Sequence, residues 1–237
     1  FVNIRAGSRR IFFTGDMGRP HDALMREPSV PESLDYLIVE STYGDRLHDL
    51  ADPETEMAAV INETVEKGGS VVIPAFAVGR AQALLYYIYQ LKKSHKIPDV
   101  PVFLDSPMAV NATQIFCHFL DEHRLSEAEC KKICEVATYI KTPDESKFID
   151  RIKTSKIIIS ASGMAEGGRI LHHLKAYAPD PHSTILFAGY QAGGTRGARM
   201  LNGEKEIKIH GEYIPVRASI KKISSASAHA DYEEILI

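Results

Sequence analysis

The chain has 237 residues, of which 44% are hydrophobic and 25% are charged. These values are ordinary for globular proteins, so they argue against disorder and allow one large domain or two moderate ones. The formal net charge of −3 excludes a basic field over the whole surface, so a nucleic-acid partner would be bound by local positive charge. No apolar run approaches the roughly 20 residues that cross a bilayer, and Phe1–Arg5 lacks the features of a signal peptide, so we expect no membrane association.

The three cysteines, Cys117, Cys130 and Cys134, include no Cys-x-x-Cys pair. An odd number of cysteines without a metal-binding spacing favours reduced thiols over a structural disulfide. We therefore expect a cytoplasmic protein.

Strands and helices alternate along most of the chain. Short apolar runs predict strands, the first two of them buried, at residues 10–13, 36–39, 70–73, 101–104, 156–160 and 184–187. Helices are predicted from Pro53 to the glycines at 68–69, over 78–91, around 115–120, after capping boxes at Ser126 and Thr142, and over about 168–177. This alternation predicts a mostly parallel α/β layer structure.

The two ends of the chain differ from the middle. From Glu206 onward the hydrophobic period changes to two, which predicts an antiparallel strand pair around His210–Glu212. The pattern indicates a middle domain inserted between two halves of another, with borders near residues 45 and 206.

Three glycine-bearing turns follow predicted strands in the middle of the chain, at 74–80, 160–169 and 189–196, and each contains an arginine. The carboxyl edge of a parallel sheet is where ligands bind, and helix N-termini and arginines attract phosphate. Glycine-rich turns also serve packing alone, but three on one edge favour a polyanionic ligand. No turn matches a P-loop or a clean dinucleotide fingerprint.

Four residues near the ends are candidates for chemistry: Asp16, Glu40, His210 and His229. A carboxylate just past a strand, flanked by glycine, is well placed to bind a metal. Each residue also has a structural alternative: Asp16 as a turn cap, Glu40 as a loop cap, His210 as a hairpin tip and His229 as the neighbour of a helix N-cap.

The other histidines have structural interpretations. His172 and His173 are assigned to surface or edge packing on an apolar helix, and His118 and His123 to structural positions. His48 is close enough to Glu40 in sequence to lie on a cleft rim.

Seven motifs in order resemble one family: Phe13–Gly18, Glu40–Arg46, Ile73–Gln82, Asp105–Ala109, Ser162–Arg169, Ile209–Glu212 and Ser227–Asp231. They are similar to the β-CASP branch of the metallo-β-lactamase superfamily, which includes RNase J and the endonuclease subunit of the pre-mRNA cleavage and polyadenylation complex. The resemblance implies an α/β fold: the C-terminal part of a metallo-β-lactamase αββα domain, at residues 1–44 and 206–237, with a parallel β-CASP domain inserted at 45–205.

The resemblance also implies roles. Asp16 is similar to the aspartate that bridges two zinc ions, Glu40 to the motif A acid, His210 to the motif B histidine and His229 to the motif C histidine, a terminal zinc ligand. Glu40 and His210 would act together as the general acid, and all four side chains would meet in one pocket. The residues expected to bind the backbone of single-stranded RNA are Gly79, Arg80, Ser162, Gly167, Gly168, Arg169 and Arg196.

The implied function is zinc-dependent phosphodiester cleavage of RNA, with a homodimer possible. The family's His-x-His-x-Asp-His motif does not occur in these 237 residues, so we expect a truncated chain with negligible nuclease activity and no stable two-zinc site of its own. The alternatives are a catalytically silent RNA-binding subunit and a small-molecule ester or thioester hydrolase.

Overall fold

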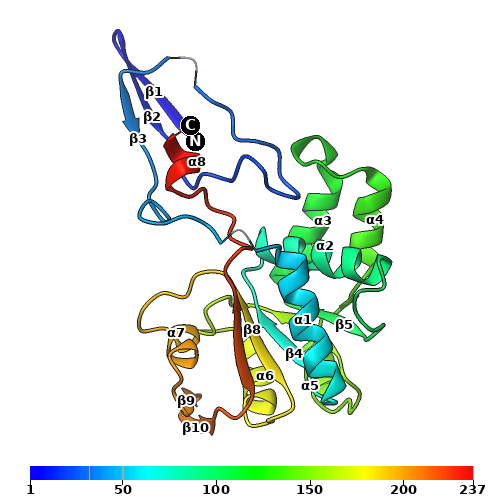
Figure 1. Ribbon diagram of the computed structural model, residues 1–237. Helices are drawn as coiled ribbons and strands as arrows, with labels where there is room; N and C mark the ends of the chain where they lie inside the picture. The colour runs from blue at the N-terminus through cyan, green and yellow to red at the C-terminus, as the bar shows by residue number, and fades with distance from the viewer. Residues whose placement is uncertain (32, 50, 237) are drawn as a thin grey trace. The chain divides into compact units, whose positions relative to one another are not determined.

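The computed structural model describes residues 1–31, 33–49 and 51–236, and the chain divides into two compact units (Figure 1). Unit 1 comprises Phe1–Asp49, Asp121–Arg124 and Ser227–Ile237. Unit 2 comprises Leu50–Leu120 and Leu125–Ala226. The chain runs from unit 1 into unit 2, returns to unit 1 at Asp121–Arg124, and ends in unit 1.

Unit 1 contains a three-stranded sheet and a short helix. Strands β1 (Val2–Ala6) and β2 (Arg9–Phe13) form an antiparallel hairpin, and β3 (Tyr36–Ile38) adds to β2 in parallel. Helix α8 (Tyr232–Leu236) comes from the other end of the chain. Because β2 and β3 are parallel, the polypeptide leaves both strands at the same edge of the sheet.

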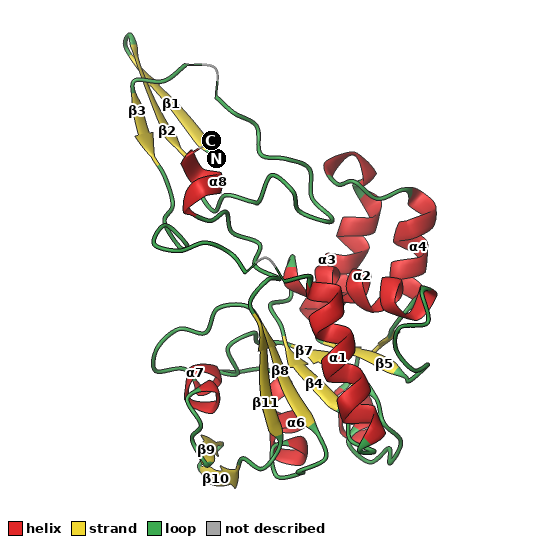
Figure 2. Cartoon of the chain, viewed as in Figure 1, coloured by secondary structure: helices red, strands yellow, loops and turns green. Residues whose placement is uncertain are grey.

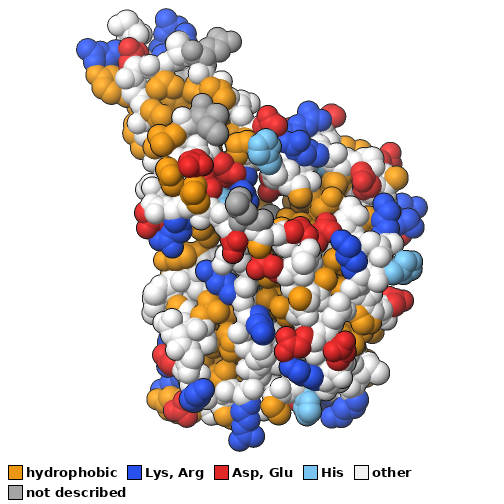
Figure 3. Space-filling model, viewed as in Figure 1, with side chains coloured by type: hydrophobic (Ala, Val, Ile, Leu, Met, Phe, Trp, Pro, Cys, Tyr) orange, Lys and Arg blue, Asp and Glu red, His pale blue; other side chains and the backbone are white. Residues whose placement is uncertain are grey.

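The first two predicted strands exist, but the prediction that they are buried is wrong for β3. Tyr36, Leu37 and Ile38 are each about half exposed, at 47%, 51% and 47%. Figure 3 shows hydrophobic side chains at the surface over this sheet. The physical reason is that the three short strands carry apolar side chains without a second described layer of unit 1 packed over them.

Unit 2 is built on a six-stranded sheet of order β11-β8-β4-β7-β5-β6, in which every neighbouring pair is parallel. The strands are β4 (Val71–Pro74), β5 (Val102–Asp105), β6 (Thr138–Tyr139), β7 (Ile157–Ser160), β8 (Thr184–Ala188) and β11 (Ser219–Ile223). The predicted parallel α/β structure is confirmed. β4, β7 and β8 lie next to one another, so the turns that follow them share one edge.

Three helices of unit 2, α1, α4 and α5, begin at the predicted caps. The helices of unit 2 are α1 (Pro53–Glu66), α2 (Arg80–Lys93), α3 (Pro107–His118), α4 (Glu127–Glu135), α5 (Pro143–Ile149), α6 (Ile170–Tyr177) and α7 (Arg196–Leu201). A 3-10 helix, η1 (Leu120–Glu122), follows α3, which begins earlier than the predicted region around 115–120. The Asp52 carboxylate accepts the first N–H groups of α1, and both capping boxes form, at Ser126 and Thr142. Among the described residues, no helix has the length and apolar character that crossing a bilayer requires.

Helices α1 and α6 lie on opposite faces of this sheet (Figure 2). Ile170 and Leu174 of α6 pack with Val72, Ile158 and Phe187 in one fully buried cluster. Burial of such side chains contributes roughly 1.5–3 kcal/mol each, which makes the sheet a rigid base for the turns at its edge.

The strand pair predicted around residue 210 forms as β9 (Glu206–Ile209) and β10 (Glu212–Pro215), and it is antiparallel. The compact unit that holds the parallel sheet extends to Ala226, past the predicted border at residue 206. The reason is that β11 lies beside β8 and extends the sheet of unit 2.

Candidate functional site

Glu40 and His229 form a hydrogen-bonded pair in unit 1. Both carboxylate oxygens of Glu40 lie 3.1 Å from Nδ1 of His229. The Glu40 side chain is 9% exposed and that of His229 is 33% exposed, so the imidazole still reaches solvent. The pair therefore joins a sheltered carboxylate to an accessible ring.

Backbone pairing brings the two residues together. Glu40 follows β3, and Gly15–Gly18 follows the parallel strand β2, so both segments leave the sheet at one edge. Gly18 forms a β-bridge with His229, and the Ala230 N–H donates to the carbonyl of Met17 at 2.8 Å. The Met17 N–H in turn donates to Glu40 Oε1 at 2.5 Å. One short loop thus touches both members of the pair.

The hydrogen bonds keep Glu40 ionised. Burial raises the pKa of Glu40, but the N–H of Met17 and the contacts with Thr42 and His229 outweigh it and hold the pKa below its ordinary value of 4.5. An ionised carboxylate only accepts hydrogen bonds, so Nδ1 of His229 carries the proton. Nε2 is then the ring nitrogen left for a ligand or for proton exchange.

Asp16 lies in the same loop, two residues before the bridge to His229, and its side chain is exposed. A carboxylate and an imidazole are donors that zinc accepts, but a structural or catalytic zinc needs at least three protein ligands. Asp16 and His229 alone do not complete such a site. Among the described residues, the one group of three close histidine or carboxylate side chains is His48, Asp231 and Glu234.

His210 belongs to unit 2. It occupies the turn between β9 and β10 with a φ of +48°, followed by Gly211 at +85°, and its ring lies 5.4 Å from that of His172. This is the hairpin tip that the sequence offered as the structural alternative. Of the four candidates, unit 1 contains Asp16, Glu40 and His229, and only the last two are in direct contact.

The three glycine-bearing turns of unit 2 contact one another. The ring of Phe76 lies so close to Gly163 that a Cβ there would come within 2.8 Å of it. The Gln191 side chain donates to the Gly163 carbonyl at 3.0 Å, and the Arg80 guanidinium lies against Gly189. The prediction that these turns share one edge is confirmed, and Gly163 permits a close approach between two of them.

The family model described as the Beta-Casp domain matches residues 81–200. The chain belongs to the β-CASP branch of the metallo-β-lactamase superfamily. It is 34% identical over its whole length to a ribonuclease of Thermus thermophilus, and 35% identical over 99% of its length to an RNase J-like protein of Methanocaldococcus jannaschii. It is 30% identical over 99% of its length to the transcription termination factor FttA of Methanosarcina mazei. The chain spans 56%, 56% and 39% of these relatives.

Several predicted RNA contacts in this β-CASP chain are already engaged within the protein. Arg169 donates to the Asp105 carboxylate at 2.6 Å and to the carbonyls of Ile140 and Lys141. Arg196 donates to the Lys208 carbonyl and to Glu166. Such guanidinium groups hold the turns in place, and binding a phosphate would cost them these bonds.

Hydrogen bonds and a close backbone approach within the 160–169 turn fix its conformation. The hydroxyl oxygen of Ser162 accepts the N–H groups of Glu166 and Gly167 at 3.1 and 3.3 Å. Gly168 has a φ of +78°, and a Cβ there would collide with the Ala161 carbonyl. The structure of the turn itself therefore requires Ser162 and Gly168, independently of any contact with RNA.

The exposed surface of this edge includes Gly79 and two aromatic side chains. Gly79 is exposed with a φ of +75° and precedes α2, whose first residue is Arg80. Phe76 and Tyr190 are 49% and 47% exposed. Aromatic side chains that are about half exposed are suited to stacking on a planar ligand.

The β-CASP sheet also contains a buried charge network that the sequence interpretation missed. His173 is not at the surface: it is fully buried, with Nε2 2.8 Å from Asp105 and Nδ1 2.7 Å from Asp150. Asp105 also accepts hydrogen bonds from Ser146 and Arg169. The missed signal is the spacing of His173 with Ile170, Leu174 and Tyr177, which places it on the buried face of α6.

Proposed function

We propose that the protein to which this chain belongs hydrolyses phosphodiester bonds of RNA with the help of zinc. The observation that carries the proposal is the Glu40–His229 pair, at the carboxyl end of a strand in a β-CASP protein. Two relatives bear the names ribonuclease and RNase J-like protein, which supports RNA as the substrate.

Within the pair, Glu40 orients the ring and His229 moves the proton. The carboxylate accepts a hydrogen bond from Nδ1–H, which fixes the tautomer and stabilises the imidazolium. His229 then donates from Nε2 to the leaving oxygen of the RNA. The resemblance gave this role to His210, but the hydrogen bond to Glu40 leads us to assign it to His229.

Asp16 is the proposed metal ligand of this chain, because its carboxylate is exposed on the loop that pairs with His229. The remaining ligands would come from a protein of the relatives' length. When bound, a zinc pair supplies a water that ionises near neutral pH and a counter-charge for the phosphoryl oxygens. The role of the chain itself is to present Asp16 and to keep Glu40 ionised.

Single-stranded RNA would contact the open edge of unit 2. Gly79 precedes a helix N-terminus, where the helix dipole favours an anionic phosphate. Phe76 and Tyr190 offer aromatic faces on which bases stack. Arg80 adds positive charge there, while Arg169 and Arg196 hold the turns.

The test uses full-length protein, a short single-stranded RNA and the variants Glu40→Gln, His229→Ala and His210→Ala, with zinc content measured for each. We expect His229→Ala to lose about 10²–10⁴-fold in kcat while keeping its zinc, because a positioned general acid contributes that much. Loss of zinc in that variant would instead make His229 a metal ligand. An equal loss of kcat, with zinc retained, in His210→Ala alone would return the role to His210.

A further inference from the structure

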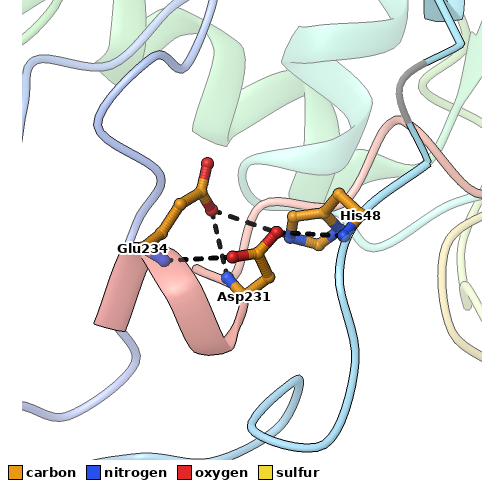
Figure 4. Close-up of side chains that lie close together, drawn as sticks. All are labelled: His48, Asp231 and Glu234. Carbon is orange, nitrogen blue, oxygen red and sulfur yellow. Dashed lines mark hydrogen bonds and ion pairs between the residues drawn. The ribbon is translucent and has the colours of Figure 1, made fainter. Parts of the chain in front are cut away.

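The His48, Asp231 and Glu234 side chains form a compact cluster in unit 1 (Figure 4). Their donor atoms lie within 4.8 Å of one another, yet each is already hydrogen-bonded. The Asp231 carboxylate accepts the N–H groups of His48, Glu233 and Glu234. The Glu234 carboxylate accepts from Asp231 N–H and pairs with Arg19 at 3.0 Å. A metal ion would therefore have to displace these hydrogen bonds in order to bind the three side chains.

The His48 side chain of this cluster also contacts the backbone of His229. Nε2 of His48 lies 2.8 Å from the carbonyl oxygen of His229, and a carbonyl only accepts, so Nε2 carries the His48 proton. The His48 N–H donates to Asp231 at 3.0 Å, two residues farther along. His48 thus contacts the backbone carbonyl of His229 and the side chain of Asp231, the two residues that flank Ala230.

We propose that His48 is a positioning residue that sets the orientation of His229 toward Glu40. The His48 side chain is 2% exposed, so water does not replace its bond to the carbonyl. Its other ring nitrogen, Nδ1, is buried without a hydrogen-bond partner among the described residues, so the ring is held here through Nε2. The proposal rests on the proposed function for its catalytic consequence only.

Ring contacts tie the two imidazoles together. The Tyr43 ring centroid lies 4.8 Å from that of His48 and 6.4 Å from that of His229, the latter in a stacked arrangement. Tyr43 also forms a parallel β-bridge with Asp231. On the opposite side, His229 is paired with Gly18. The backbone at 229–231 is thereby fixed from two directions, and losing the His48 ring bond removes the contact that acts directly on the His229 carbonyl.

The test compares His48→Leu, which removes the donor, with His48→Gln, whose side-chain N–H can reach the same carbonyl. In full-length protein we expect His48→Leu to lower kcat for RNA by roughly 10–100-fold with KM unchanged, because misplacing a reacting group by about 1 Å costs on that scale. His48→Gln should recover most of the loss. The control is His123→Leu, a buried histidine of unit 1 that pairs with Met25; it should leave kcat near the wild-type value.

A second readout is independent of RNA. Long-range ¹H–¹⁵N spectra of the present chain report the ring nitrogens of His229, and its Nδ1–H signal should change in His48→Leu and return in His48→Gln. Wild-type spectra and kcat in folded His48→Leu would overturn the proposal. If that variant does not fold, a folded His48→Gln with a displaced His229 signal and low kcat would overturn it. Wild-type protein that cleaves no RNA would defeat the proposed function, and the spectra would still test the positioning.

Discussion

Glu40 accepts a hydrogen bond from Nδ1–H of His229, with both carboxylate oxygens 3.1 Å from that nitrogen, although the two residues lie at opposite ends of the chain. The Met17–Gly18 loop makes this possible, since it donates to Glu40 and forms the bridge to His229. A hydrogen bond from a ring nitrogen to an ionised carboxylate is stronger than one between neutral groups. The pair should therefore contribute to stability as well as to chemistry.

The Glu40→Gln substitution should lower the free energy of unfolding of unit 1 near neutral pH. The difference from the wild type should disappear in acid. The pKa of Glu40 is held below 4.5 in the folded chain, so its contribution is present above pH 4.5 and disappears as the pH falls through the lower folded pKa. Urea unfolding of both proteins from pH 6 to pH 3 measures this. The control is Glu27→Gln, an exposed glutamate whose ion pair with Arg124 is worth less than about 1 kcal/mol. Parallel curves for wild type and Glu40→Gln would contradict the prediction.

The buried network of unit 2 predicts the opposite pH dependence. Burial lowers the pKa of His173, but the carboxylates of Asp105 and Asp150 outweigh it and raise the pKa above 6.5. Its contribution is complete below pH 6.5 and is lost as the pH rises through the folded pKa. The urea concentration at the unfolding midpoint of the wild type should therefore decrease as the pH rises above 6.5.

In His173→Gln this alkaline decline should be absent, and the variant should be less stable at pH 6 by about 3–5 kcal/mol, because one partner of a buried charged group is removed. His172→Gln, at the exposed neighbouring position, is the matched control and should keep the wild-type profile. An unchanged slope in His173→Gln would assign the pH dependence to another group.

Local signals in the sequence are sufficient for most of the helices and strands and for the candidate residues of the site. Asp52 and Pro53 mark the start of α1 because a side-chain cap acts within a few residues. Asp16 and Glu40 are candidates because each carboxylate comes just past a predicted strand. The turns of unit 2 are predicted to lie together because the carboxyl ends of parallel strands share an edge.

Long-range pairing was not visible in the sequence. The partner of Glu40 depends on the bridge between Gly18 and His229, which no local pattern encodes. His173 was placed at the surface because its carboxylate partners, Asp105 and Asp150, are distant in sequence. Arg169 was assigned to phosphate for the same reason, since its partner, Asp105, lies far away in the sequence at the end of β5.

Phe76→Ala should weaken the binding of single-stranded RNA to full-length protein. Stacking of one base on an aromatic ring contributes about 1–3 kcal/mol, so the Kd should rise roughly 5- to 150-fold. Phe148→Ala is the control, because Phe148 is 63% exposed on α5 and lies outside the three turns. Fluorescence anisotropy with a labelled oligonucleotide gives both values. Equal Kd values for the two variants would show that Phe76 does not contribute to RNA binding.

Residues 1–237 alone should bind no pair of zinc ions and should show negligible nuclease activity. Asp16 is the metal ligand proposed within the chain, and even together with the imidazole of His229 it provides too few ligands for one catalytic zinc, much less two. The other close donor group, His48, Asp231 and Glu234, is occupied by its own hydrogen bonds. Metal analysis after dialysis with zinc should therefore give well below two ions per chain, and the double variant Asp16→Asn with His229→Ala should give the same background. Two tightly held zinc ions per chain, lost in the double variant, would show that these residues form a complete site with donors not recognised in unit 1.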